Sequence, residues 1–439
     1  MNPPFARPDL RSSYRYLLWW IALGGVTGVV GACVLALFTW IVDAGQRLLL
    51  VTGVPVPLAA IVAALIVGGV VYRVSPDAAG EGIPSYLYAL NRGRARFPLR
   101  ATLMKFPAAV FTLIGFGSGG VVGPVGRVTS GLVSLIGSRY GDERLREERS
   151  HTAAVCGMAA TLAALFHAPI GGGIFAVEIV QRANMRYRDL FPAVLAGAVS
   201  VAFSRLMGWG PLIEITDQPA VIELGFLPWT IGFSLVVGLL GSVYVRGYGL
   251  AVKIFRRDQG RVVLKVVVGM AAASLLVWLV NPALLGTAAE LTGALSNGEP
   301  GLLYGAFAAT TPLALVAVVM LFVRMASSYL TTGSGMSAGL TAPAIQLGML
   351  AAIAAARFVQ VVAGQDLTGA FLAVGFAGML AGSMNVPIAA AVLAVEVFGT
   401  GLGTPAIFAS VIAFQMNRHS TIYDFALAGS GHMDEAGPA

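Results

Sequence analysis

The stretch GFGSGGVVGPVGRVTSG, residues 115–131, interrupts an apolar region with six glycines between Gly115 and Gly126 and with Pro124. Gly and Pro break a membrane helix, and the freed backbone groups then need partners from protein, water or a ligand. A helix that restarts at residues 121–124 directs unpaired N–H groups and the positive end of its dipole into the protein. This arrangement predicts an anion site at a broken helix. The alternative is a close helix crossing that small residues permit.

The composition is that of a polytopic membrane protein. The chain has 439 residues, of which 57% are hydrophobic and 11% charged, whereas soluble domains carry about 25% charged residues. Cys33 and Cys156 provide no disulfide framework, and neither the cysteines nor the four histidines have metal-ligand spacing. We therefore expect membrane-spanning helices and no metal site built from cysteine or histidine. The net charge of +7 indicates topology and contact with anionic lipid rather than nucleic acid.

Basic residues predict the orientation in the membrane. Arg7, Arg11 and Arg15 precede the first apolar run, which lacks a signal-peptide cleavage site. Because basic loops of membrane proteins stay on the cytoplasmic side, the N-terminus is expected in the cytoplasm. The membrane is expected to be a bacterial-type inner membrane. The other basic loops are expected on the same side: residues 92–100, 144–149, 182–188 and 256–261.

An internal repeat divides the chain. Residues 157–178, GMAATLAALFHAPIGGGIFAVE, share the spacing of Gly, Pro and Glu with residues 375–396, GFAGMLAGSMNVPIAAAVLAVE. The Gly-Ser-Gly of residues 117–119 recurs at 333–335. Interrupted segments that correspond in two halves predict a substrate site between them, near the middle of the membrane.

The repeat gives predicted boundaries: a cytoplasmic N-terminal segment 1–15, a first membrane repeat 16–208, a linker 209–225, a second membrane repeat 226–427 and a polar tail 428–439. No appended soluble domain is expected. Within the second repeat, Arg324 separates two apolar segments, 303–323 and 326–356.

Four short motifs in order resemble the ClC family of chloride channels and proton-coupled chloride transporters. Residues 80–84, GEGIP, resemble its G-S-G-I-P loop, and residues 120–124, GVVGP, its G-R-E-G-P loop. Residues 339–343, GLTAP, resemble G-x-F-x-P, and Tyr423 matches the pore tyrosine. Alone, the first loop could be a surface turn and Tyr423 an interfacial aromatic residue. The resemblance covers nearly the whole membrane domain.

The resemblance implies an all-α polytopic membrane protein with an inverted-topology repeat and broken, re-entrant helices. It implies a homodimer with one anion pathway in each subunit and no metal or organic cofactor. The implied anion-binding residues are Gly80, Glu81, Gly82, Ile83, Pro84, Gly120, Val121, Val122, Gly123, Pro124, Gly339, Leu340, Thr341 and Tyr423. Lys105 also matches the family pattern.

Two departures remove the family's proton carriers. The gate glutamate of G-R-E-G-P is Val122 here, and the inner proton-relay glutamate is Ile179. An aliphatic side chain carries neither a proton nor a charge. The sequence therefore predicts passive, channel-like transport of small monovalent anions, chloride first, without the usual proton coupling and without an enzymatic activity.

Two further departures change the anion site itself. The serine of G-S-G-I-P is Glu81, and the phenylalanine of G-x-F-x-P is Thr341. An ionised carboxylate beside an anion is costly, so it must protonate, swing away or take the anion's place. We hypothesise that Glu81 gates the pore in place of the glutamate missing at Val122. The alternative is that Glu81 points into an aqueous vestibule and tunes selectivity. Thr341 could supply the hydroxyl lost at Glu81.

The sequence leaves other functions open. One is an antiporter in which Glu81 carries the proton, and another is a pore for fluoride, nitrate or another anion. The remote one is an intramembrane serine hydrolase, because residues 335–339 match G-x-S-x-G. That motif needs a strand-turn-helix context and a positioned base. The cations Lys105 and Arg324 are expected to attract anions rather than bind them directly. Arg127 either lines an aqueous vestibule and attracts anions, or is a snorkelling or helix-capping arginine.

Overall fold

The computed structural model describes residues 10–138, 143–180, 185–214, 224–256, 261–297 and 300–427. Within these ranges the chain is helical and has no β-strand, and a single isolated β-bridge joins Gly120 to Gly339. Residues 1–9 of the predicted N-terminal segment 1–15, residues 215–223 of the predicted linker 209–225 and the whole predicted tail 428–439 lie outside the described residues, as do Arg182 and Arg257 of the basic loops.

Nine helices belong to the described part of the first half. They are α1 (Leu10–Val51), α2 (Val56–Ile66), α3 (Tyr72–Val74), α4 (Ile83–Asn91), α5 (Leu99–Ile114), α6 (Val122–Gly137), α7 (Glu143–Phe166), α8 (Pro169–Glu178) and α9 (Tyr187–Leu206). A π-helical turn, η1 (Val67–Val71), joins α2 to α3, and a short 3-10 segment, η2 (Pro76–Ala78), precedes α4. The break between α5 and α6 lies in the glycine-rich stretch, as predicted.

The described part of the second half begins with η3 (Leu224–Phe226) and contains nine more helices. They are α10 (Leu227–Arg256), α11 (Val262–Val280), α12 (Ala289–Ser296), α13 (Leu313–Gly333), α14 (Thr341–Ala363), α15 (Thr368–Met384), α16 (Pro387–Phe398), α17 (Gly403–Asn417) and α18 (Ile422–Leu427). Three more 3-10 segments, η4 (Pro282–Leu284), η5 (Pro300–Leu303) and η6 (Thr400–Leu402), lie between them.

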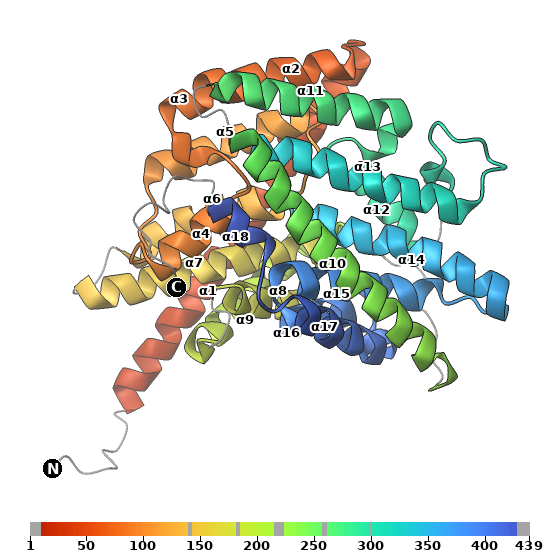
Figure 1. Ribbon diagram of the computed structural model, residues 1–439. Helices are drawn as coiled ribbons and strands as arrows, with labels where there is room; N and C mark the ends of the chain where they lie inside the picture. The colour runs from red at the N-terminus through yellow and green to blue at the C-terminus, as the bar shows by residue number, and fades with distance from the viewer. Residues whose placement is uncertain are drawn as a thin grey trace.

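The long helices run between two opposite sides of the molecule (Figure 1). Seven helices among the described residues are long and apolar enough to cross a membrane. Helix α1 packs on α7 and α9, and α10 packs on α15 and α17, while the broken helices α6 and α14 are covered by α7 and α15. The short helices α4 and α18 contact each other in the interior.

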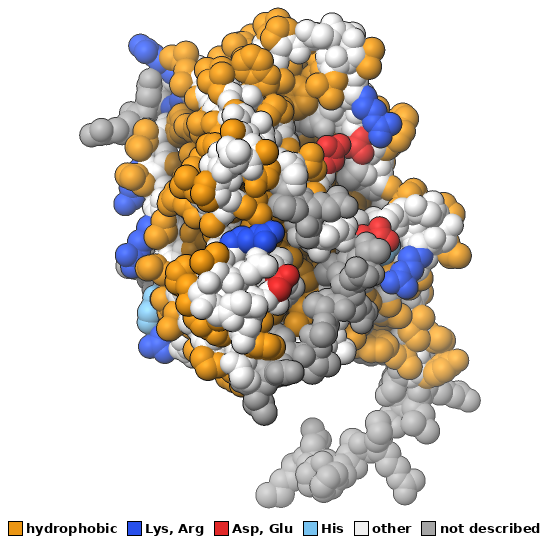
Figure 2. All heavy atoms as spheres, turned by 90° about the vertical axis from the view of Figure 1, so that its right-hand side faces the viewer, with side chains coloured by type: hydrophobic (Ala, Val, Ile, Leu, Met, Phe, Trp, Pro, Cys, Tyr) orange, Lys and Arg blue, Asp and Glu red, His pale blue; other side chains and the backbone are white. Residues whose placement is uncertain are grey.

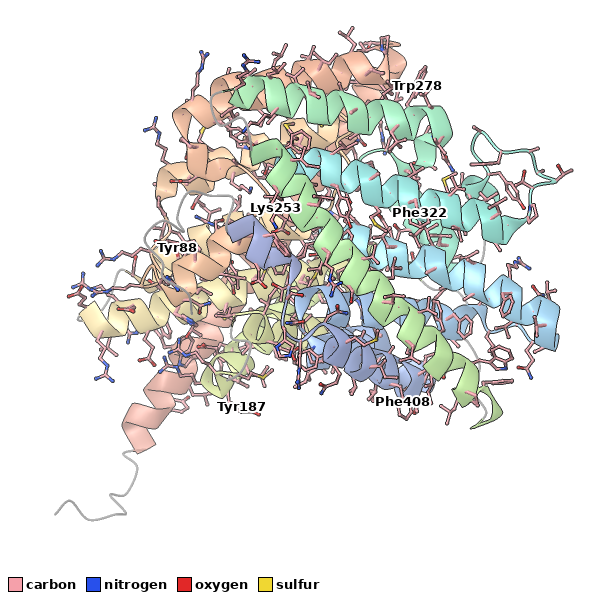
Figure 3. All side chains as sticks on the ribbon, viewed as in Figure 1. Tyr88, Tyr187, Lys253, Trp278, Phe322 and Phe408 are labelled. Carbon is pink, nitrogen blue, oxygen red and sulfur yellow. The ribbon has the colours of Figure 1, made fainter. Side chains whose placement is uncertain are left out.

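The exterior is largely apolar. Trp278 and Phe322 point away from the protein (Figure 3) and are 46% and 59% exposed. In Figure 2, hydrophobic side chains dominate the face presented to the viewer, and charged groups are few. A soluble monomer does not expose so much apolar surface, so this exterior is suited to contact with lipid. The protein is therefore a multi-pass membrane protein.

The two halves are joined by reciprocal contacts. Gly120 and Gly339 exchange two backbone hydrogen bonds of 2.7 Å. The N–H of Ser118 donates to Oγ1 of Thr331 (3.1 Å), and the N–H of Ser337 donates to Oγ1 of Thr112 (3.3 Å). These contacts make Ser337 the counterpart of Ser118. The sequence match of residues 117–119 with 333–335 was therefore wrong in register, because it paired Ser118 with Ser334.

A second reciprocal contact joins α8 and α16. The carboxylate of Glu178 accepts the N–H groups of Ile388 (3.1 Å) and Ala389 (2.7 Å) at the start of α16. The carboxylate of Glu396 accepts those of Ile170 (3.0 Å) and Gly171 (2.6 Å) at the start of α8. Each repeat thus caps a helix of the other repeat, because a carboxylate satisfies the unpaired first-turn N–H groups.

The apolar segments 303–323 and 326–356 are not separate helices. Arg324 separates two apolar segments in the sequence, but α13 continues through it to Gly333, and the chain breaks only at residues 334–340. The guanidinium is fully buried and bonded to Oε1 of Gln346 (2.6 Å), Oγ of Ser118 (2.6 Å) and three backbone carbonyls. A charge with five hydrogen bonds can occupy the middle of a buried helix.

Candidate functional site

Three helices begin close together in the interior. Helix α4 begins at Ile83, α6 at Val122 and α14 at Thr341, and each has a proline in its first turn: Pro84, Pro124 and Pro343. Proline suits this place because it has no N–H to leave unpaired. The starts of α6 and α14 carry no side-chain cap. Their partial positive charges therefore add at one place.

Glycines allow this close approach. A Cβ on Gly120 would lie 2.7 Å from Cβ of Ala342, and one on Gly119 would lie 2.3 Å from Cβ of Ala338. Gly82 has a φ of +119°, and a Cβ there would lie 2.5 Å from the carbonyl oxygen of Gly123. Contacts this short exclude a side chain, which explains why the sequence has glycine at these positions.

The carboxylate of Glu81 lies where the three helices begin. Its Oε2 accepts the N–H of Ile83 at 2.7 Å, and its Oε1 accepts the N–H of Leu340 at 3.3 Å. A Cβ on Gly123 would lie 2.3 Å from the same Oε1. Glu81 is only 2% exposed. Its negative charge thus occupies the place that helix dipoles and first-turn N–H groups prepare for an anion.

Two hydroxyl groups beside Glu81 complete the cluster. Thr341 and Tyr423 are each 1% exposed, and neither hydroxyl has a hydrogen-bond partner of good geometry among the described residues. The Tyr423 hydroxyl interacts electrostatically with Glu81 and lies within weak hydrogen-bonding reach of the Thr341 hydroxyl. Buried hydroxyls without partners are costly. They are therefore available as donors to an anion or a water molecule.

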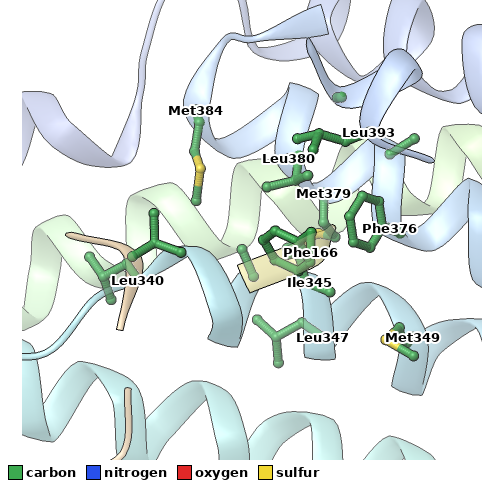
Figure 4. Close-up of a cluster of buried hydrophobic side chains, with 14 of the residues drawn as sticks. Phe166, Leu340, Ile345, Leu347, Met349, Phe376, Met379, Leu380, Met384 and Leu393 are labelled. Carbon is green, nitrogen blue, oxygen red and sulfur yellow. The ribbon is translucent and has the colours of Figure 1, made fainter. Parts of the chain in front are cut away.

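The buried side chain of Leu340 holds this residue in place. It is fully buried, and in Figure 4 it lies at one end of the apolar cluster that includes Met384 and Ile345. The hydroxyl of Tyr244 donates to its carbonyl oxygen at 3.2 Å. Side chain and carbonyl are thus engaged elsewhere, and the N–H of Leu340 points to Glu81.

The structure brings most of the predicted site residues together. Residues 80–84, 120–124 and 339–341 meet around the Glu81 carboxylate, with Tyr423 beside it. Val122 is fully buried and offers no polar side chain there. Ile179 lies apart from this cluster. Its neighbours Ala176 and Val180 accept hydrogen bonds from Tyr86 and Asn91, near the far end of α4.

Sequence reasoning missed the partner of the Gly80 loop. The carbonyl oxygen of Gly335 accepts the N–H of Gly80 (3.1 Å) and the hydroxyl of Tyr72 (2.6 Å). Neither contact leaves a signal in a short motif, because the partners are far apart in the chain. The pairing ties the loop before α4 to the loop before α14.

Three buried cations surround the broken helices: Lys105, Arg127 and Arg324, which are 2%, 5% and 0% exposed. Among the described residues, none of the three forms an ion pair with a carboxylate. Arg127 bonds to Ser85 and Thr102, both at 3.1 Å, and stacks over Phe97. Arg127 also interacts electrostatically with Asp77, and Lys105 with Glu81. Buried positive charges favour anions in their neighbourhood.

A surface cavity of about 510 Å³ lies away from this cluster. It is lined by Arg94, Arg96, Glu143 and Arg146 among others, at the end of the molecule that carries the basic loops. Glu81, Thr341 and Tyr423 do not line it. The site between the helices is closed, because the carboxylate fills it.

The G-x-S-x-G motif has no catalytic surroundings. Ser337 is fully buried in the loop before α14, and its hydroxyl has no hydrogen-bond partner among the described residues. Its N–H donates to Thr112. A nucleophile elbow requires a hydrogen-bonded base, and none is placed next to this serine within the described part of the chain.

Comparison with known proteins identifies the family. The profile of a family described as "Voltage gated chloride channel" matches residues 63–418. An H(+)/Cl(-) exchange transporter ClcA from Citrobacter koseri is 30% identical over 405 residues, covering 87% of this chain and 80% of that protein. A chloride/fluoride channel protein from Pseudomonas syringae pv. tomato is 22% identical over 434 residues, covering 95% and 88%.

Solved structures show the same fold. A CLC-type fluoride/proton antiporter superposes with a TM-score of 0.77 at 19% identity, covering 94% of this chain and 98% of that one. A slow cyanobacterial Cl-/H+ antiporter superposes with a TM-score of 0.71 at 21% identity, covering 94% and 97%. With the family profile matched over most of the chain, this protein belongs to the ClC family of anion channels and transporters.

Proposed function

We propose that this protein is a passive, channel-like pathway for small monovalent anions, with chloride as its main substrate and Glu81 as its gate. The observation that carries the proposal is the position of the Glu81 carboxylate, on the N–H groups of Ile83 and Leu340. An anion and an ionised carboxylate cannot share these donors. The pore is therefore blocked while Glu81 is ionised and in place, and it conducts when Glu81 is protonated or displaced.

The absence of the usual carriers supports a passive mechanism. Val122 and Ile179 stand at the two positions where coupled relatives hold proton-transferring glutamates, and both are buried aliphatic residues. We further propose a homodimer with one pore in each subunit, placed in a cell inner membrane with the N-terminus in the cytoplasm. The predicted boundaries, 16–208 and 226–427, remain our proposal for the two repeats.

A second candidate is an anion/proton antiporter in which Glu81 carries the proton. A buried carboxylate that leaves its donors only after protonation can bind a proton on one side and release it on the other. The ClcA relatives are named as exchange transporters. Fluoride is a second candidate anion, since the relative from Pseudomonas syringae is named a chloride/fluoride channel.

The deciding experiment measures chloride and protons together. Purified protein is placed in liposomes with a KCl gradient, valinomycin is added, and chloride efflux and external pH are recorded simultaneously. We expect fast efflux without stoichiometric proton uptake. Proton movement in a fixed ratio to chloride would replace the channel by the antiporter, and replacing KCl by KF or KNO₃ tests the anion.

The gate is tested with Glu81→Gln. We expect this variant to lose the pH dependence of efflux and to conduct roughly tenfold faster at neutral pH, as a difference of about 1.4 kcal/mol between blocked and open states would give. Glu147→Gln, which changes an exposed carboxylate on α7, is the matched control. An unchanged pH profile in Glu81→Gln would remove Glu81 from gating.

A further inference from the structure

Two buried cations occupy corresponding positions in the two repeats. Lys105 lies on α5, which precedes the broken helix α6, and Arg324 lies on α13, which precedes the broken helix α14. Each donates hydrogen bonds to three carbonyl oxygens of a loop in its own half. Lys105 Nζ bonds to Ala78 (3.1 Å), Ala79 (3.4 Å) and Gly80. Arg324 bonds to Leu284 (3.0 Å), Gly286 (3.0 Å) and Thr287 (3.2 Å).

The two loops share a pattern of positive φ angles but not one conformation, since Gly82 has a ψ of −48° and Ala288 a ψ of +39°. Each has two residues with positive φ separated by one residue: Gly80 (+74°) and Gly82 (+119°) in the first, Gly286 (+60°) and Ala288 (+51°) in the second. Each leads directly into a short helix, α4 or α12. The residue between the two positive φ angles is Glu81 in the first loop and Thr287 in the second. The second half therefore shows the same cation-to-loop contact without a carboxylate.

In the first half, the hydrogen bonds of Lys105 to its loop orient the Glu81 side chain. The three carbonyls that Lys105 holds belong to the residues immediately before Glu81. On its other side the loop is held by Gly335, whose carbonyl oxygen accepts the N–H of Gly80. With the backbone held on both sides, the Glu81 side chain has little freedom except toward the N–H groups of Ile83 and Leu340.

The surroundings of Glu81 hold one opposing charge in electrostatic contact with it, Lys105 on α5, among the residues that the structure describes. Arg127 on α6 interacts with Lys105, and the phenols of Tyr423 on α18 and Tyr244 on α10 also face the carboxylate. Lys105 thus balances one negative charge at this place. That charge belongs to the carboxylate when the site is closed and to the anion when it is open.

We propose that Lys105 is the positioning residue of the Glu81 gate. Its hydrogen bonds to the carbonyls of residues 78–80 hold the carboxylate on its donors, and its charge makes the ionised carboxylate and a bound anion interchangeable. This inference rests on the proposed role of Glu81 as gate, and it assigns to Lys105 no contact with the anion itself.

Removing Lys105 acts on the gate in two ways. Loss of the charge makes protonation of Glu81 easier, so the pore opens at higher pH. Loss of the hydrogen bonds frees the loop, so the ionised carboxylate leaves its donors more often. Both effects move the acid activation of anion efflux toward alkaline pH.

Two substitutions separate these effects. Lys105→Gln removes the charge but keeps an amide that can donate to the carbonyls, whereas Lys105→Met, of similar length, removes both. Anion efflux from proteoliposomes is measured as a function of pH for each. We expect the midpoint to rise by about one pH unit in Lys105→Gln, and by more in Lys105→Met. Arg127→Gln, which loses a buried charge that makes no hydrogen bond to the loop, is the control and should shift the midpoint less.

The outcomes are distinct. A wild-type midpoint in both Lys105 variants, or equal shifts in the two, would overturn the positioning role. If size-exclusion chromatography and thermal melting show that Lys105→Met is not folded, the pH midpoints of Lys105→Gln and Arg127→Gln are compared instead. Lys105→Gln combined with Glu81→Gln should have no pH dependence, and a remaining shift would also overturn the inference. Wild-type efflux that does not depend on pH would instead overturn the gate on which the inference rests.

Discussion

Gly123 is the residue whose missing side chain makes room for the gate. A Cβ at this position would lie 2.3 Å from Oε1 of Glu81 and 2.8 Å from its carbonyl oxygen. Gly123→Ala should displace both the carboxylate and the backbone of Glu81, because both contacts are under 3.0 Å and each has to be relieved. We expect faster efflux at neutral pH with reduced pH dependence, and a loss of stability of about 1–3 kcal/mol.

The double variant provides the control for Gly123→Ala. In a Glu81→Ala background the carboxylate is already absent and only the 2.8 Å contact with the carbonyl oxygen of residue 81 remains, so adding Gly123→Ala should change efflux much less than it does in the wild type. An equal change in that background would mean that the added methyl group alters the pore directly and not through the gate. The measurement is chloride efflux at two pH values for the wild type, both single variants and the double variant.

For single residues, the sequence predicted which ones form the site but not which residues they contact. The motif at residues 80–84 singled out Glu81 because a carboxylate replaces a serine there. It could not identify Leu340 as the donor, since that residue is 259 positions away. The role of Gly335 was equally hidden, because its contribution is a backbone carbonyl, which every residue possesses.

Among the elements, α8 and α16 depend on each other's carboxylates. Glu178→Gln and Glu396→Gln each replace an ionised cap by a neutral one, so each should lower stability by about 1 kcal/mol. Thermal unfolding in detergent should show a midpoint lower by a few degrees in each variant. Because Glu178 is engaged as a cap, anion efflux per folded protein should not change.

Glu147→Gln again serves as the comparison, since this carboxylate is exposed and caps neither helix. Melting temperatures equal to wild type in both Glu178→Gln and Glu396→Gln would show that the caps do not contribute. A changed proton-to-chloride ratio in Glu178→Gln would instead assign proton handling to this residue.

Helix breaks were predictable where glycine and proline cause them, and not where a charge was the only signal. The break at residues 115–121 lies where GFGSGGV occurs, because those residues cannot continue a helix. Arg324 separates two apolar segments of the sequence, yet α13 runs through it, because buried carbonyls and Ser118 satisfy the guanidinium. The predicted alignment of the two repeats at Gly-Ser-Gly was also wrong in register, because a match of three residues is too short to fix an alignment.

For the whole molecule, orientation is the property to test. Helices α7 and α12 lie on opposite sides of the protein (Figure 1), and Arg146 and Glu290, near their starts, are exposed. With Cys33 replaced by alanine and Cys156 buried, a cysteine introduced at either position is the thiol that a membrane-impermeant maleimide can label. We expect Glu290→Cys to react in intact cells and Arg146→Cys to react only after permeabilisation.

The opposite pattern of labelling would invert the proposed topology, and labelling of both from outside would contradict the spanning arrangement. The membrane class was predictable from composition, because 57% hydrophobic residues cannot be covered in a soluble protein of this size. Subunit association was not predictable from composition, because the outward apolar residues of α8, α16 and α17 can contact lipid or a second subunit equally well.

The bridge between Gly120 and Gly339 has a consequence for the origin of the protein. Neither half contains a complete site, because the donors to Glu81 come from Ile83 in one half and Leu340 in the other. A half-length precursor could have formed this site only by pairing with a second copy inserted upside down in the same membrane. Fusion of two such copies would place both orientations in one chain. Each half could then acquire different buried residues, such as Lys105 in the first half and Arg324 in the second.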